Sequence, residues 1–92
     1  MFIAITIHHH IPRHEQALAG FMDEVADSVA DAPGLIDFKT CRDVRGHYLA
    51  GYSCWQSEHA FQAALPAIRA MAPARDPGWT DQPDETIRLV TV

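Results

Sequence analysis

Six histidines are the side chains of this 92-residue sequence best suited to proton transfer, and His8, His9 and His10 are consecutive. An imidazole titrates near neutral pH, so a histidine that faces a dry pocket could accept a proton from a bound substrate. His8, His10 and His14 could also approach a metal ion. No CxxC spacing and no carboxylate at a matched spacing supplies a further ligand of fixed geometry, so we expect no metal site. The simpler interpretation is that these histidines are polar residues at a strand end or an interface.

A tryptophan lies where the sequence period changes from strand to helix. The segment from Tyr48 to Trp55 has the large aromatic and apolar residues of a half-buried strand, and Ser57 can cap the helix that follows. Trp55 therefore occupies a strand-to-helix corner. Its indole suits the mouth of a pocket, and it suits an ordinary hydrophobic corner equally well.

Small residues next to Trp55 predict unfilled space. Gly51 and Ser53 share its side of the strand, and such positions leave room that is either filled by a helix side chain or becomes a pocket. We expect a pocket whose substrate-binding lining consists of Gly51, Ser53, Phe21, Met22, Phe61 and Leu65.

The histidine run ends a first strand, which is predicted to extend from Met1 to Ile11. Alternation divides this strand into a side with Ile3, Ile5, Ile7 and His9, and a side with Phe2, Ala4, Thr6, His8 and His10. The isoleucine side is the more apolar. We therefore predict that it faces the helices and carries His9 toward the pocket, whereas the other side, with Tyr48, Ala50, Tyr52 and Cys54, faces a second subunit.

The remaining elements follow from periodicity and from chain-breaking residues. A helical stripe begins at Glu15 and is ended by Pro33 and Gly34, and a second helix contains Pro66, which should kink or split it. The predicted elements are a helix over Glu15 to Ala32, strands over Leu35 to Val44 and Tyr48 to Trp55, a helix from Glu58 to about Met71, a loop over Ala72 to Asp84 and a strand over Thr86 to Val92. This βαββαβ order predicts a single α+β, ferredoxin-like domain over residues 1–92, with a four-stranded antiparallel sheet and both helices on one face.

Composition excludes several classes of function. The formal net charge is -5 and the basic residues are scattered, so no nucleic-acid surface is expected. No apolar run approaches the roughly 20 residues of a membrane span, and no signal peptide is evident, so we expect a cytoplasmic protein without membrane contact. Cys41 and Cys54 are predicted to lie too far apart on one hairpin for a disulfide.

One stretch resembles a known family. Pro33 to Phe38 after a long helix, together with Tyr48, Tyr52 and the sequence WQSEHAF from Trp55 to Phe61, resembles the antibiotic biosynthesis monooxygenase (ABM) domain superfamily. The resemblance covers nearly the whole chain. It implies a homodimeric α+β barrel with a ligand pocket between each sheet and its own helices, and it places Trp55 at that pocket.

The resemblance implies two chemistries. Some relatives oxidise quinols or anthrones with O₂ and no cofactor; on that model His9, His59 and Trp55 would be the catalytic residues and the substrate a small aromatic molecule. Other relatives bind and degrade haem, with an Asn on the first strand and a haem-ligating His on the second helix. Here the expected helix-facing side holds Ile3, Ile5 and Ile7, and the second helix has only His59, so no cofactor is expected. A non-catalytic binding or structural homodimer remains the alternative.

Overall fold

The computed structural model describes residues 1–92 and has the predicted order of elements. The strands and helices are β1 (Phe2–His8), α1 (Glu15–Ser28), β2 (Leu35–Arg42), β3 (Leu49–Trp55), α2 (Glu58–Ala70) and β4 (Glu85–Val90). The loop predicted after the second helix contains two short 3₁₀ turns, Ala72–Ala74 and Pro77–Trp79. The ferredoxin-like α+β architecture predicted from the sequence is therefore confirmed.

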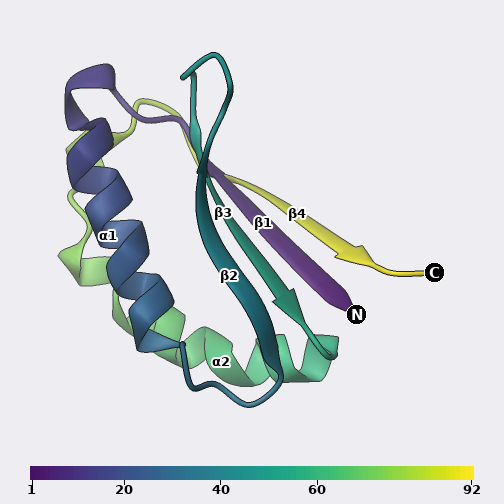
Figure 1. The fold of residues 1–92 in the computed structure, drawn as a ribbon. Coiled ribbons are helices and arrows are strands. Elements are labelled where there is room, and N and C mark those ends of the chain that lie inside the picture. The colour runs from purple at the N-terminus through teal and green to yellow at the C-terminus, as the bar shows by residue number, and fades with distance from the viewer.

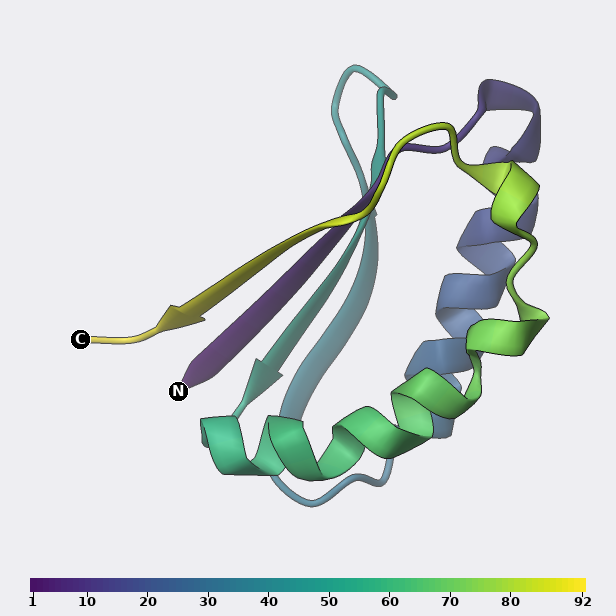
Figure 2. The same cartoon turned by 180° about the vertical axis from the view of Figure 1, so that it is seen from behind.

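The four strands form one antiparallel sheet in the order β2-β3-β1-β4. Figures 1 and 2 show both helices on one side of this sheet and no element on the other side. We call these the covered face and the open face. Neither helix combines the length and the hydropathy that a bilayer crossing requires.

The second helix begins where the sequence predicts, because Ser57 caps it. The Ser57 hydroxyl accepts a hydrogen bond from the backbone N-H of Ala60 at 3.1 Å, which satisfies one of the free donors of the first turn. Pro66 was expected to kink or split the second helix. It lies inside α2, and the helix is not split. The first helix ends at Ser28, before the predicted Ala32, and the intervening residues form a turn.

Two groups of apolar side chains on the covered face hold the helices to the sheet. Phe2, Trp55 and Phe61 pack with ring centroids 5.1 Å apart for the phenylalanine pair and 5.8 Å apart for Trp55 and Phe61. Leu18 and Met22 of α1 pack on Leu49 of β3. Burying such side chains is worth about 1.5–3 kcal/mol each, so these contacts fix the distance between sheet and helices.

The prediction for the two sides of β1 was wrong. Phe2 and Ala4 are 2 % and 5 % exposed beneath the helices, whereas the isoleucines lie on the open face. The pairing shows why: Ala4 lies opposite Ser53 and Thr6 opposite Gly51, so the even residues of β1 share the face of the small residues of β3. Consequently Phe2 and Ala4 are not available to a second subunit.

A bulge changes the alternation within β2. Leu35 lies opposite Trp55, but Asp37, two residues later, lies opposite the adjacent Cys54, so one extra residue is accommodated at Ile36. Leu35 therefore packs against the core with Phe38 on the covered face, although strict alternation predicts opposite sides for them. Farther along the hairpin Cys41 lies opposite Ala50, as predicted, and both cysteines are free.

The open face is largely apolar over β1, β3 and β4, and it carries the ion pair of Asp37 and Lys39 on β2. Its central rows combine β1 with its two neighbours, because Ile5 lies opposite both Tyr52 of β3 and Ile87 of β4. Ile87 and Leu89 on the edge strand are 41 % and 48 % exposed. The apolar members of the face are Ile3, Ile5, Ile7, Ala50, Tyr52, Cys54, Ile87 and Leu89.

Candidate functional site

A cavity of about 300 Å³ lies between the covered face of the sheet and the two helices. This size is at the small end of the range for small-molecule sites, roughly 300–1,000 Å³. We call it the inner cavity; its lining residues are Ala4, Thr6, His8, Phe21, Met22, Val25, Phe38, Gly51, Ser53, Phe61, Leu65, Ile68, Arg69, Ala72, Arg75, Asp84, Thr86 and Arg88.

Short side chains on two neighbouring strands open this cavity. Ala4 pairs with Ser53 and Thr6 pairs with Gly51, so four small residues form one block on the covered face. A Cβ built on Gly51 would lie 3.7 Å from the terminal methyl of Met22, which is ordinary van der Waals contact. The sheet and the helices are therefore held apart by the large residues around the block and do not close onto it.

The six residues proposed from the sequence as a substrate-binding lining all face this cavity. They are Gly51, Ser53, Phe21, Met22, Phe61 and Leu65. Trp55 is placed differently. It is fully buried between Phe2 and Phe61, where it supports the wall without lining the cavity. Its predicted position at a pocket mouth does not match this packing.

His9 points away from the inner cavity. Because β1 has the opposite orientation from that predicted, His9 lies on the side of the open face, with its Nε2 2.5 Å from Oε2 of Glu85. Its ring also approaches that of Tyr48 edge-on, with centroids 6.4 Å apart. A histidine in this position cannot reach a ligand between the sheet and the helices.

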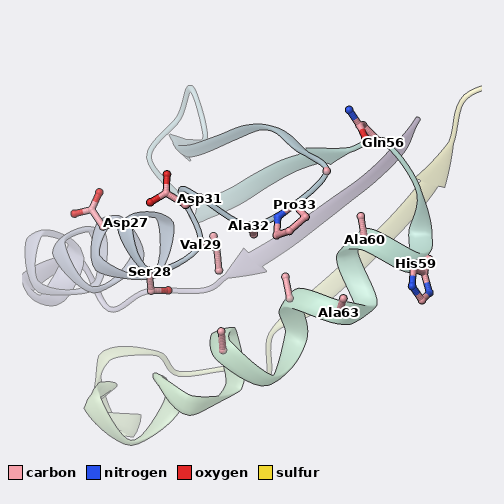
Figure 3. Close-up of a pocket in the computed structure, with 13 residues that line it drawn as sticks. Asp27, Ser28, Val29, Asp31, Ala32, Pro33, Gln56, His59, Ala60 and Ala63 are labelled. Atoms are coloured by element: carbon pink, nitrogen blue, oxygen red, sulfur yellow. The ribbon is translucent and has the colours of Figure 1, made fainter.

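His59 also lies outside the inner cavity. It lines a second pocket of about 550 Å³, which we call the outer pocket, between the end of α1, the following turn and α2. Figure 3 shows His59 and Ala60 at the start of α2, with Asp27 and Asp31 at the other end of the pocket. This pocket is larger, but its walls are mainly alanine and exposed polar residues. It therefore has fewer side chains that could take part in a reaction than the inner cavity has.

The histidine that lines the inner cavity is His8. Its side chain is 11 % exposed, and its Nδ1 lies 3.1 Å from Oδ1 of Asp84, a close contact at an angle that does not make a good hydrogen bond. Asp84 is held on its other side by Arg75, with Nη1 2.5 Å from Oδ2 and Nη2 2.9 Å from Oδ1. Arg75 also donates to Thr80 at 3.2 Å. These contacts place a fixed carboxylate behind the imidazole.

Burial and the nearby charge of Asp84 shift the pKa of His8 in opposite directions. Desolvation lowers the pKa of His8 below its usual 6.5, and the neighbouring Asp84 carboxylate only partly offsets this effect. For Asp84, burial alone would raise the pKa, but the hydrogen bonds from Arg75 and the proximity of His8 lower it overall. At neutral pH the cavity therefore holds a neutral imidazole beside an ionised carboxylate.

The sequence contained a signal for His8 that periodicity alone did not reveal. Small residues recur at Ala4 and Thr6 on β1 and at Gly51 and Ser53 on β3. Matching these two small pairs across the sheet assigns the even side of β1, and with it His8, to the same face as the expected pocket. Asp84 and Arg75 lie in and next to a loop, where no periodicity indicates direction.

No protein-family model and no characterised sequence matches this chain. Solved structures do. Rv0793 from Mycobacterium tuberculosis superposes with a TM-score of 0.83 at 15 % identity, over 99 % of this chain and 94 % of that one. A crystal structure of an antibiotic biosynthesis monooxygenase superposes with a TM-score of 0.80 at 13 % identity, over 100 % and 99 %. This chain has the ABM fold.

An ABM-fold protein that binds a porphyrin is also similar. An MhuD variant with two manganese protoporphyrin IX molecules in each active site superposes with a TM-score of 0.81 at 22 % identity, over 100 % of this chain and 95 % of that one. The resemblance in fold inferred from the sequence is thus confirmed. At these identities the comparison concerns the fold, and the chemistry must be argued from this chain's own side chains.

The residues of the inner cavity do not fit the haem ligation implied by the haem-degrading relatives. That pattern needs an imidazole from the second helix, but α2 contributes Phe61, Leu65, Ile68 and Arg69 to the cavity. His59, the only histidine of α2, lines the outer pocket. No group of three His, Cys, Asp or Glu side chains is arranged to hold a metal ion.

Proposed function

We propose that this protein is a small cofactor-independent monooxygenase that oxidises an aromatic, quinol or polyketide-like substrate in the inner cavity. The observation that carries the proposal is a mostly apolar cavity whose wall presents one neutral, Asp84-backed imidazole, that of His8. An electron-rich aromatic that loses a proton in such a place can react with O₂ itself. The protein then has to bind the substrate, exclude water and accept a proton.

His8 is the proton acceptor in this proposal. Its Nδ1 faces Asp84, so Nε2 is the nitrogen left for the substrate, and the carboxylate stabilises the imidazolium that forms. For an anthrone, His8 removes a proton from the reacting carbon, and the carbanion transfers electrons to O₂ to give a hydroperoxide. Loss of water leaves a carbonyl: one oxygen atom enters the product and the other leaves as water, with the proton returned by His8.

A homodimer completes the proposed assembly. The open face presents a row of apolar side chains, with Ile87 and Leu89 41 % and 48 % exposed. Apolar patches of this kind mark protein contacts, and a second copy of the same face covers it with matching chemistry. The ABM fold of the neighbouring structures supports this arrangement.

O₂ consumption with a panel of anthrones and quinols tests the proposed function. We expect turnover by the wild type, a loss of about 100-fold or more in kcat for His8→Gln, and no loss for the matched variant His9→Gln. Since the pKa of His8 is lowered, the neutral form persists below pH 6.5, and the acid limb of the rate should lie below that value.

Two results would contradict the proposal. Full activity of His8→Gln with an unchanged pH profile would remove His8 from the mechanism. Binding of an aromatic compound without any O₂ consumption would favour the alternative, a non-catalytic small-molecule binding homodimer that uses the same cavity.

A further inference from the structure

The wall of the inner cavity is rich in positive charge, although the chain as a whole is acidic. The sequence has 7 Lys and Arg against 12 Asp and Glu. Three of the basic residues, Arg69, Arg75 and Arg88, line this cavity, whereas Asp84 is its single acidic residue. Three of the seven basic residues thus gather around one cavity, with Arg69 and Arg88 as exposed side chains at its edge.

Two of these three guanidinium groups have no carboxylate partner. Arg75 is engaged by Asp84 through two hydrogen bonds. Arg88 and Arg69 take part in none of the ion pairs of the structure. The guanidinium of Arg88 instead lies over the ring of Phe61, 5.3 Å from its centroid. Their charges therefore remain available to a bound anion.

The two unpaired arginines approach the cavity from different elements. Arg88 lies on β4 opposite Ala4, and Arg69 lies in the last turn of α2. A guanidinium binds a carboxylate through two parallel hydrogen bonds, and it does so more strongly where apolar walls exclude part of the water. The walls here include Phe61, Leu65 and Ile68.

The strand register separates Arg88 from His8. Arg88 is level with Ala4, and His8 lies four residues farther along the same face of β1. At about 3.3 Å per residue this is a backbone separation of about 13 Å, which the long arginine side chain can shorten. An anionic group and a reacting carbon on one ligand would thus lie toward opposite ends of the molecule.

We propose that the ligand of the inner cavity is an elongated aromatic carboxylate, bound through its carboxylate by Arg88, with its far end directed to His8. The role of the far end rests on the proposed function. The anionic site itself follows from the unpaired guanidinium of Arg88 above Phe61 and from the apolar walls.

Calorimetric titration with two unreactive probes tests the anionic site. Anthraquinone-2-carboxylate and anthraquinone-2-carboxamide share a shape and differ in charge. We expect the carboxylate to bind the wild type about tenfold more tightly or better, because charged hydrogen bonds replace neutral ones, with the preference shrinking at high salt. Arg88→Gln should abolish the preference, and Arg69→Gln, which removes the other unpaired charge of the wall, should reduce it less. Arg13→Gln, which removes an exposed arginine outside the cavity, should leave it unchanged.

Equal affinity of the two probes, or absence of binding of both, would overturn the inference. So would a preference that survives in the Arg88→Gln, Arg69→Gln double variant. Because these probes are not turned over, the result is independent of catalysis. O₂ consumption without a charge preference contradicts only this inference, and a charge preference without O₂ consumption contradicts only the proposed monooxygenase.

Discussion

The two faces of the sheet are both apolar but differ in how their side chains are used. On the covered face large residues, among them Phe2, Trp55 and Leu49, surround a block of small ones, so that packing leaves a cavity. On the open face isoleucines and Tyr52 form an even surface, and the hydrogen-bonded His9 and Glu85 lie at its end. The share of apolar residues on a face therefore does not distinguish the covered face from the open face. The variation in side-chain size along the face does.

The largest effect should follow from removing the support of the covered face. Trp55→Ala deletes a fully buried indole that packs on Phe2 and Phe61, and we expect a loss of about 3–5 kcal/mol in the free energy of unfolding. Chemical denaturation measures this loss. Val44→Ala, at a residue that is 99 % exposed, should change stability by less than about 0.5 kcal/mol. A loss below about 1 kcal/mol for Trp55→Ala would mean that the corner is not tightly packed.

An intermediate effect is expected from a charge on the open face. Ile5→Glu places a carboxylate between Tyr52 and Ile87, where a second subunit would desolvate it without a partner. Dimer dissociation, followed by light scattering over a dilution series, should become easier by about 100-fold or more. Gln16→Glu adds the same charge on the exposed side of α1 and should not alter association. A wild-type monomer at micromolar concentration would contradict the proposed dimer.

The smallest effect on stability is expected where the cavity itself is filled. Gly51→Leu extends past the terminal methyl of Met22, which lies 3.7 Å from the added Cβ and has to shift, so the variant should cost about 1–3 kcal/mol while it abolishes binding of an anthraquinone probe. Gly20→Leu, at a position with no atom within 4 Å of the added Cβ, should leave binding intact. Retained binding in the cavity variant would place the ligand elsewhere.

Residues with distinctive size or conformational demands allowed most of the fold to be predicted. Ser57 marks the start of α2, Pro33 and Gly34 follow the turn after α1, and Gly51 and Ser53 indicated the cavity. The orientation of β1 was predicted wrongly, because the more apolar side of a strand is a reliable guide only when the sheet has one apolar face. Because of that single error, His9 was predicted to face the cavity, whereas the histidine that lines it is His8.

The rest of the site depends on the tertiary structure and not on sequence period. Asp84 and Arg75 are nine residues apart, in a segment of turns rich in proline, and only the folded chain brings both beside β1. His59 follows the cap of α2 and was predicted to be catalytic. The rotation of the helix directs Phe61 and Leu65 inward, as predicted, but leaves His59 in the outer pocket.

The extra residue at Ile36 decides which residues of β2 face the cavity. It therefore decides whether this strand places a charged side chain on the cavity wall. Counting from Leu35 opposite Trp55, an unbroken ladder would align Asp37 with Ser53 and place a carboxylate on the cavity wall, next to the space that Arg69 and Arg88 also line. With the insertion, Phe38 takes that place and Asp37 moves to the opposite side. Without this one extra residue, the carboxylate of Asp37 would offset the positive charge of the arginines, and the cavity would no longer attract anions.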